Sequence, residues 1–585
     1  MLANSTSKSK SVRSSVRSKT ARGSIDAVEQ IDNNEHGMEE KLESSVGEDD
    51  ESRYPPFRIV LLSVICLYAA TFLASLDRTI IGVAIPAISN EFKSFGDIAW
   101  YEAAFLLTMS VAQLPMGKIY TFFPAKWTFF VIVVIFEIGS TVCASARSSE
   151  ALIVGRAITG IGAAGIFVGV AVIGTDLVPL RKRPMLQGIS GAFLGIASII
   201  GPIVGGAFTT KASWRWCFWL NLCIGVPALT GTLFYLPTSP PAEKSDGKFM
   251  EKLWKFDPIG NILLAPGLVC MLLALQWGGT KYPWNNAKVL ALIIMGSILL
   301  LGFATTQYFQ ESGTVPPRIL RQRSVAAGLI TSIGFGAALI IPTFYLPIWF
   351  QAIKGTTAVN AGVRLLPLML VTSVFVLVAG FGMARTGYYT PWLIVGCAIR
   401  IVGVGLLTTL QVDAKSAQWI GYQVLVGIGT GMTFSPVSTA VQTVLPRKDI
   451  PVGMTVMLFA QFFSGTIAVS ICQAVLSNVL HTELPRKLPG FDAAAIAKAG
   501  ATEIRQMVSS ADLPVVLKVY NKGISNTFLV ALAFSGLALV SSLFVEWKSV
   551  KTRPPASGGG DEGGEVKSSQ ALAGEPQIQL AETKK

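Results

Sequence analysis

Charged residues and histidine are scarce in this sequence. Only 14% of its 585 residues are charged and 51% are hydrophobic, whereas about a quarter of the residues are charged in an ordinary soluble domain. A soluble globular fold is therefore excluded, because the apolar surplus needs lipid to face. The two histidines, His36 and His481, lie in an amino-terminal tail and beyond an apolar run. A histidine relay or a histidine-based metal site inside the membrane is excluded as well.

The sequence also lacks two motifs that carry common chemistry. It contains no GxxxxGK[ST] phosphate loop, so it has no nucleotide-hydrolysing motor of the P-loop kind and must draw energy from a gradient. It contains no CxxC spacing, and its cysteines lie in or at the edge of apolar runs, where they serve as small packing residues. They are Cys66, Cys143, Cys217, Cys223, Cys270, Cys397 and Cys472. We therefore expect no cofactor and no metal.

The net charge of +13 does not indicate a nucleic-acid partner. The Lys and Arg residues lie in short loops and in a tail between or beyond the apolar runs, rather than on one continuous basic face. We expect the partners to be a small-molecule substrate, protons and the lipid bilayer, without nucleic acid, and we expect the chain to act as a monomer.

What the sequence does contain is a series of long apolar runs between Phe57 and about Trp547. Each has about 20 residues, the length at which a helix crosses a hydrocarbon core of about 30 Å. The runs predict an all-α integral membrane protein with about fourteen transmembrane helices. We place these near residues 57–88, 98–119, 126–146, 150–174, 186–208, 216–236, 257–278, 287–308, 324–350, 360–383, 391–411, 418–442, 452–478 and 525–546.

The loop charges predict the orientation of these helices. One alternate set of loops holds about twice as many Lys and Arg residues as the other, and such residues stay on the cytoplasmic side. We therefore expect both termini in the cytoplasm, as polar disordered tails at 1–56 and 548–585. The first tail has no signal-peptide core, so the first helix should be the uncleaved targeting signal. The segment 479–524 should lie outside, with a surface helix at 493–510 and a gate or cap role.

An internal repeat indicates two related halves. Gly160-Ile161-Gly162 followed by Pro179 recurs with the same spacing as Gly427-Ile428-Gly429 followed by Pro446. Parallel duplication of a helix bundle is the plan of a rocking transporter whose binding site lies between the halves.

This repeat sets the predicted domain boundaries. They are an N-terminal six-helix bundle at 57–236, a linker at 237–323 with two inserted helices, and a C-terminal six-helix bundle at 324–547.

Ionisable residues inside the apolar runs are the first functional candidates, since each costs at least about 2.5 kcal/mol to insert. Counting about 1.5 Å per residue from the helix midpoints places Asp77 about 8 Å and Arg156 about 9 Å outside the midplane. The two should therefore meet and could exchange a proton. The alternatives are a fixed structural ion pair or an Arg that reaches the outer interface. Glu137, near the midplane, is either a proton site or a hydrogen-bonded packing residue.

A glycine-rich stretch in the fifth run is a candidate for conformational change. Gly188, Gly201, Gly205 and Gly206 leave several faces without bulky side chains, so that neighbouring backbones can approach closely, and Pro202 can bend the helix.

These motifs together resemble one family. Leu76–Ile80 ending in Ala84-Ile85-Pro86 is similar to the first-helix signature of the fourteen-helix drug:proton antiporters of the major facilitator superfamily, and Gly155–Ala164 resembles their fourth-helix motif. Gly188–Gly206 resembles the motif associated with export, and Trp214–Phe218 with Asn221 resembles fungal toxin pumps. The resemblance implies two six-helix bundles plus two inserted helices, efflux driven by protons, and a role for Arg156 in proton transfer.

Three positions depart from the family pattern. Ala197 replaces a usual Gly, Cys223 replaces a usual Pro, and Thr121 stands where many facilitators have Asp. The gating salt bridge of that loop is therefore in doubt.

Aromatic residues near the expected cavity between the halves are the substrate-binding candidates, because an apolar cavity suits hydrophobic ligands. They are Trp100, Tyr101, Phe105, Tyr345 and Trp349. For any single one, a lipid-facing or core position is the alternative.

The sequence thus predicts a proton-coupled exporter of a toxin, secondary metabolite or drug in the cell membrane, and not an enzyme. The alternatives are a siderophore or basic amino acid exchanger of the same fold, with the vacuolar membrane as its alternative location, and a membrane-embedded enzyme or a sensor that no longer transports.

Overall fold

The computed structural model describes residues 54–94, 97–241, 256–278, 282–310, 313–488, 508–509 and 511–551. Within these ranges the chain is helical apart from turns and two isolated β-bridges. Most of both predicted tails, 1–53 and 552–585, and most of the expected surface helix at 493–510 lie outside the described residues. The first residues of the second predicted tail are ordered, because the backbone N–H of Val550 donates to the carbonyl oxygen of Gly387 at 2.8 Å.

The first six long helices pack mainly against one another. The central contacts are those of α5 with α3 and α4 and of α2 with α6 and α7, and Phe105, Phe129 and Phe136 lie in the buried core between them. The helices are α2 (Phe57–Phe92), α3 (Ile98–Phe122), α4 (Ala125–Ala144), α5 (Ser149–Leu177), α6 (Arg183–Lys211) and α7 (Trp216–Tyr235), with the short η3 (Leu180–Lys182) before α6. We call this group the N-terminal half.

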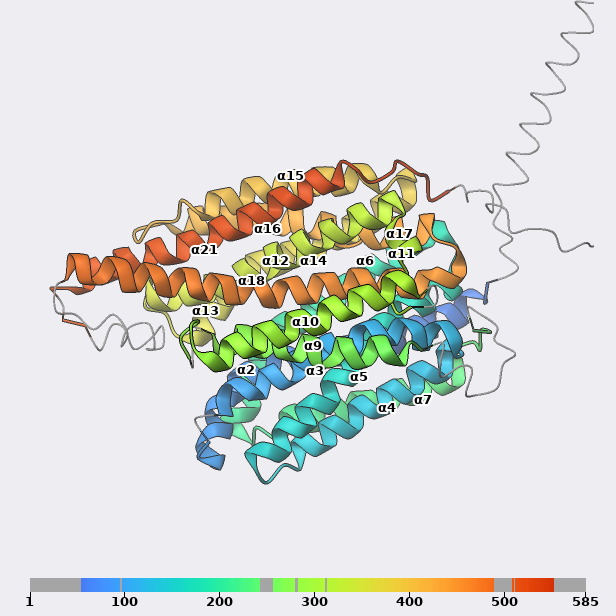
Figure 1. Ribbon diagram of the computed structural model, residues 1–585, viewed down its shortest axis with the longest axis horizontal. Coiled ribbons are helices and arrows are strands. Elements are labelled where there is room, and N and C mark those ends of the chain that lie inside the picture. The colour runs from blue at the N-terminus through green and yellow to red at the C-terminus, as the bar shows by residue number, and fades with distance from the viewer. Residues whose placement is uncertain are drawn as a thin grey trace, which may run out of the picture. The chain divides into compact units, whose positions relative to one another are not determined.

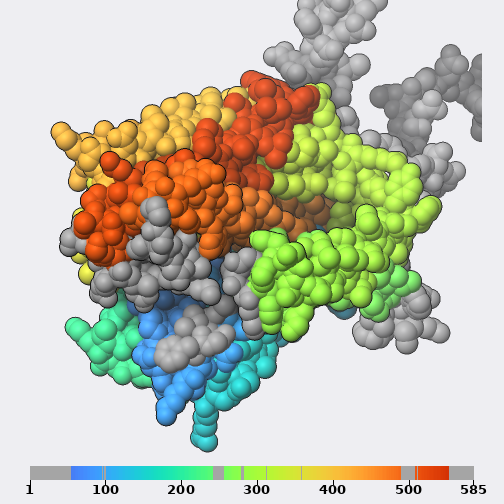
Figure 2. Space-filling view, turned by 60° about the vertical axis from the view of Figure 1, so that its left-hand side comes forward, coloured from blue at the N-terminus to red at the C-terminus, as the bar shows by residue number. Residues whose placement is uncertain are grey.

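Two inserted helices follow, as expected. The hairpin of α9 (Pro258–Trp277) and α10 (Ala287–Phe309) packs on itself and, through α9, on α3. Only Val289, Gly296 and Gln307 of α10 are buried, so most of its apolar surface faces outward, where lipid would cover it. Figure 1 shows the two helices side by side, and Figure 2 shows the green hairpin on the surface of the molecule.

The remaining helices form the C-terminal half around a second core that includes Tyr345, Trp349 and Phe350. Two of its spans are broken, at Leu365, two residues before Pro367, and at Ser435, directly before Pro436. The elements are α11 (Pro317–Leu320), α12 (Arg323–Ala352), α13 (Ala358–Arg364), α14 (Leu366–Thr386), α15 (Thr390–Leu407), α16 (Ser416–Phe434), α17 (Pro436–Val444), η4 (Arg447–Asp449), α18 (Ile450–Lys487) and α21 (Leu513–Ser542).

The predicted all-α membrane fold is confirmed. Among the described residues, thirteen helical spans are long and apolar enough to cross a membrane. The other long helix is α3, which has 25 residues and carries the polar side chains Glu102, Gln113 and Lys118. With α3 included, the long helices match the fourteen predicted runs.

The predicted bounds of the segment 479–524 need correction, because both of its ends are helical. α18 continues to Lys487 and α21 begins at Leu513. Hydropathy marks where the apolar run ends, whereas the helices extend beyond it as a pair. Their seam stays apolar through Leu484 and Val516, and Lys522 forms an ion pair with Glu483 at 3.1 Å.

The two halves meet along two helix pairs, α6 with α14 and α3 with α18. Close approach requires glycine at both seams. A Cβ atom at Gly380 would lie 2.6 Å from the carbonyl oxygen of Pro184, and one at Gly117 would lie 2.7 Å from Oγ1 of Thr455. Both seams lie toward the predicted cytoplasmic end.

Candidate functional site

Asp77 and Arg156 form an ion pair inside the N-terminal half. Nη1 of Arg156 on α5 lies 2.5 Å from Oδ2 of Asp77 on α2, and both side chains are 0% exposed. The helices run in opposite directions and bring the two residues to one level, as the estimate of their depth predicted. A buried pair of this kind is stable only when hydrogen bonds satisfy its remaining polar atoms.

Two neighbouring helices supply such hydrogen bonds. Nδ2 of Asn221 on α7 donates to Oδ1 of Asp77 at 3.1 Å and to Oγ of Ser140 on α4 at 2.7 Å. Nε of Arg156 donates to the backbone oxygen of Tyr101 on α3 at 2.9 Å. The guanidinium group also lies over the ring of Phe105, 4.5 Å from its centroid. Five helices therefore hold one acid and one base.

The cluster is not fully satisfied. Nη2 of Arg156 and Oδ1 of Asn221 have no hydrogen-bond partner among the described residues. A buried donor or acceptor without a partner costs free energy, so this network is only partly satisfied by the described residues.

Glu137 is the second buried carboxylate of this half. It lies on α4, one turn before Ser140, and is buried. Neither carboxylate oxygen has a hydrogen-bond partner among the described residues, and Gly225 of α7 leaves the space that the side chain fills. No described residue therefore supplies the hydrogen bond that a packing role for Glu137 would use. A charged carboxylate at this place has no donor to stabilise it.

A chain of hydroxyl groups continues from Tyr101 along the outer end of the N-terminal half. The hydroxyl of Tyr101 pairs with Oγ of Ser94 at 2.6 Å and with Oγ of Ser149 at 3.0 Å. Ser149 in turn donates to Oδ2 of Asp97 at 2.6 Å. The same residue thus holds Arg156 through its backbone and joins this chain through its side chain.

The glycines of α6 lie on two surfaces of the helix, one in contact with α2 and the other in contact with α14. Gly201 and Gly205 face α2, where a Cβ atom at Gly205 would lie 2.8 Å from Cγ1 of Ile80. Gly188 faces α14, where a Cβ atom would lie 3.0 Å from the carbonyl oxygen of Val376. Gly206 has more room, with its nearest neighbour 3.8 Å away. Pro202 lies exposed within a continuous helix.

Four of the five aromatic candidates do not lie on a cavity wall. Tyr101 and Phe105 surround Arg156 inside the N-terminal half. Tyr345 and Trp349 lie in the core of the C-terminal half, where Nε1 of Trp349 donates to Oδ1 of Asn521 at 2.7 Å. These side chains pack within the halves because their flat apolar rings fill space between helices. Only Trp100 is partly exposed.

The predicted cytoplasmic ends of the halves are joined by an ion pair that the sequence did not single out. Nη2 of Arg447 lies 2.6 Å from Oδ1 of Asp176 at the end of α5. Thr121, which replaces the usual acid, donates only to the backbone oxygen of Gly117 within its own helix. The doubt about the loop at Thr121 is therefore justified, and a different pair joins the halves.

Sequence comparison identifies the family behind this geometry. Residues 67–469 match the model of the Major Facilitator Superfamily, which is more than half of the chain. The chain belongs to the major facilitator superfamily. It is a multi-pass membrane protein of this family.

Several curated major facilitator proteins are similar over most of their length. The chain is 43% identical to the MFS-type transporter VdtG of Byssochlamys spectabilis, covering 83% of this chain and 87% of that protein. It is 42% identical to the efflux pump aflT of Aspergillus parasiticus, covering 84% and 96%. It is 40% identical to the rubrofusarin-specific efflux pump aurT of Gibberella zeae, covering 86% and 92%.

Solved structures of major facilitators share the fold. The proton:xylose symporter XylE superposes with a TM-score of 0.55 at 14% identity, covering 85% of this chain and 98% of XylE. The human organic anion transporter MFSD10 superposes with a TM-score of 0.52 at 11% identity, covering 82% and 100%. The likeness confirms the two-bundle facilitator fold.

Proposed function

We propose that this protein exports small hydrophobic or amphipathic molecules in exchange for protons by alternating access. Its curated relatives include proteins named as efflux pumps, among them one specific for rubrofusarin. The substrate class is therefore a toxin, a secondary metabolite or a drug. We assign transport rather than catalysis, in the cell membrane, by a monomer with both termini in the cytoplasm.

The proposed proton coupling rests on the buried ion pair of Asp77 and Arg156. Asp77 alternates between its ion pair with Arg156 and a protonated state, because cation and proton compete for one carboxylate. When Asp77 is protonated, Arg156 keeps the backbone oxygen of Tyr101 and the ring of Phe105 as partners. Asn221 moves with this exchange, since it bonds to Asp77 directly.

Glu137 serves as the second proton site in this proposal. Among the described residues it is buried without a hydrogen-bond donor, and it lies on the same helix as Ser140, which joins the Asp77 cluster through Asn221. Replacement by Gln keeps its shape. Glu137→Gln should therefore lower transport driven by a pH gradient, because the amide cannot carry the proton. Unchanged transport would show that Glu137 only fills space.

The coupling reaches the C-terminal half through α6. Thr79 and Ile80, which contact Gly201 and Gly205 of α6, follow Asp77 within one turn of α2. The inner part of α6 packs on α14 of the other half. A shift of α2 on protonation is therefore passed along a rigid helix to the seam between the halves.

Two positions are the best remaining candidates for substrate contact, and one of them, Arg78, lies between the halves. Arg78 of α2 lies over the ring of Phe462 of α18, 6.0 Å from its centroid, and Trp100 is partly exposed at the start of α3. Amphipathic ligands suit a site of aromatic rings with few polar anchors.

The experiment that tests this proposal first identifies a transported compound, by comparing the metabolites retained in cells with and without the protein. Transport of that compound is then measured in inside-out vesicles with an imposed pH gradient. Asp77→Asn should abolish gradient-driven accumulation, while exchange of labelled for unlabelled compound without a gradient continues. The matched control is Asp413→Asn, since Asp413 is an exposed acid. Equal accumulation by wild type and Asp77→Asn would refute the assignment.

A further inference from the structure

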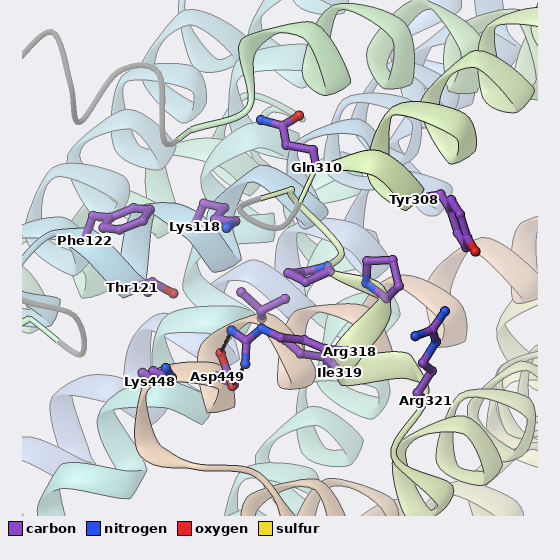
Figure 3. Close-up of a pocket in the computed structure, with 13 residues that line it drawn as sticks. Lys118, Thr121, Phe122, Tyr308, Gln310, Arg318, Ile319, Arg321, Lys448 and Asp449 are labelled. Atoms are coloured by element: carbon purple, nitrogen blue, oxygen red, sulfur yellow. Dashed lines mark hydrogen bonds and ion pairs between the residues drawn. The ribbon is translucent and has the colours of Figure 1, made fainter. Parts of the chain in front are cut away.

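A basic cavity lies at the predicted cytoplasmic end of the described chain, away from Asp77. It has a volume of about 630 Å³, and Figure 3 shows the residues that line it. Its charged side chains come from several elements: Lys118 from α3, Arg318 from α11, Arg321 from the turn that follows, and Lys448 and Asp449 from η4. The lining therefore holds four cations and one carboxylate.

The carboxylate is already engaged. Asp449 accepts two hydrogen bonds from Arg318, at 2.5 and 2.6 Å, and Figure 3 shows this pair in the middle of the cavity. Arg321 and Lys448 are exposed and form no ion pair within the described residues. The cavity therefore has an excess of positive charge that an anionic group would neutralise.

The rest of the lining suits an amphiphile rather than a small free ion. Phe122, Ile319 and Val452 give the cavity an apolar wall, and Tyr308 adds an aromatic ring at the end of α10. Tyr308 is 65% exposed and its neighbour Phe309 is 80% exposed. Exposed aromatic residues at a helix end are typical of the level where lipid headgroups meet water. Most of α10 presents apolar surface on which acyl chains can lie.

We propose that this cavity binds the phosphorylated headgroup of an anionic phospholipid of the cytoplasmic leaflet. Arg321 and Lys448 contact the headgroup phosphate, and the acyl chains run along α10. Basic pockets between membrane helices on the cytoplasmic side have the right charge for such headgroups. This proposal rests on the proposed orientation of the chain, which places the cavity at the cytoplasmic leaflet. It does not depend on the proposed proton coupling.

The position of the cavity gives the bound lipid a conformational consequence. Lys118 belongs to the N-terminal half, whereas Lys448 and Val452 belong to the C-terminal half. A headgroup in this cavity contacts residues of both halves, so it binds best when the inner ends of the halves are close together. The lipid therefore favours the state in which the inner ends of the halves are in contact.

The test measures lipid binding without any transport. The full-length protein is reconstituted in neutral phosphatidylcholine discs with a minor fraction of phosphatidylserine or phosphatidylinositol 4-phosphate, and retained lipids are counted by native mass spectrometry. The double variant Arg321→Gln with Lys448→Gln should lose anionic-lipid affinity by about tenfold or more. The matched control, Lys126→Gln with Arg385→Gln, removes the same charge from other helix ends on the same predicted side and should keep the affinity for anionic lipid.

Several outcomes separate the explanations. The proposal is overturned if the cavity variant retains as much anionic lipid as wild type. It is also overturned if the control variant loses as much anionic lipid as the cavity variant. Competition by inorganic phosphate as effective as competition by the lipid also overturns it, since the ligand would then be a free phosphate. Unchanged melting temperatures in pure phosphatidylcholine show that both variants are folded. If Asp77→Asn failed to uncouple transport, the lipid-binding result would still stand, because it does not depend on proton coupling.

Discussion

The carboxylate of Asp77 on α2 is the centre of a buried network of polar side chains inside the N-terminal half. Asp77 bonds to Arg156 and to Asn221, and Asn221 bonds to Ser140. Removing one partner of a buried ion pair leaves an uncompensated charge, whereas removing both leaves none. This difference separates the structural contribution of the pair from its role in transport.

The stability of the pair can be tested with a single and a double variant. Arg156→Ala should destabilise the protein by about 3–5 kcal/mol, because it leaves Asp77 charged and buried. Adding Asp77→Asn should restore much of that loss, since the neutral amide needs no cation. Thermal unfolding in detergent measures both effects. Proton-driven transport should stay absent in the double variant, and a double variant that transports normally would contradict the assigned roles.

Reasoning from the sequence found the pair but not its surroundings. Asp77 and Arg156 were predictable because ionisable residues inside apolar runs are rare and helix rise fixes their depth. The role of Asn221 as a partner was missed, although an amide inside an apolar run was a usable signal. The burial of Tyr345 and Trp349 could not be predicted, because nearly every side chain in such a run is apolar and hydropathy does not tell which face meets the core.

At the scale of elements, α6 is one of the helices of the N-terminal half that contact the C-terminal half. Its outer glycines meet α2 and its inner glycines meet α14. Overpacking a close contact of this kind costs about 1–3 kcal/mol. The neighbouring Gly206, where a Cβ atom would make only an ordinary van der Waals contact, provides a control at nearly the same depth.

The pair Gly205→Ala and Gly206→Ala tests the α2–α6 contact. A methyl group at Gly205 would come within 2.8 Å of Ile80, whereas one at Gly206 would lie 3.8 Å from Val83. We expect Gly205→Ala to lower the melting temperature and slow transport, and Gly206→Ala to change neither. Both would be measured in the same membrane preparation, and equal effects of the two substitutions would argue against the α2–α6 contact as the link.

The ends of elements were harder to predict than their existence. All fourteen apolar runs are helices, because the period and length of such runs leave no other structure in lipid. The helices α18 and α21, however, extend far beyond their runs. Their outer turns are held by an apolar seam and by Lys522 with Glu483, which are contacts between segments distant in sequence.

At the scale of the whole described chain, the ends of the halves at the predicted cytoplasmic side are in contact. Asp176 and Arg447 bridge them, and Gly117 lies against Thr455. Transport requires these contacts to open and close in each cycle, so they should contribute modestly to the closed state. An ion pair that is partly exposed contributes about 0–1 kcal/mol after screening.

Reversing the charges tests this closure. Arg447→Asp should place two acids opposite each other and shift the population toward open cytoplasmic ends, and adding Asp176→Arg should shift it back. The shift is measured as the distance between spin labels at Lys182 and Arg385, which lie on opposite halves near the contact of Arg181 with Ala384. The idea fails if the double variant is as open as Arg447→Asp alone.

The most direct test of the account is proton movement driven by the substrate. Purified protein is reconstituted in liposomes that contain a pH-sensitive dye, and a gradient of the transported compound is imposed without any initial pH difference. Wild-type protein should move protons against the flow of the compound, and Asp77→Asn should move the compound without protons. Proton movement by Asp77→Asn at the wild-type rate would contradict the claim that Asp77 and Arg156 couple the two fluxes.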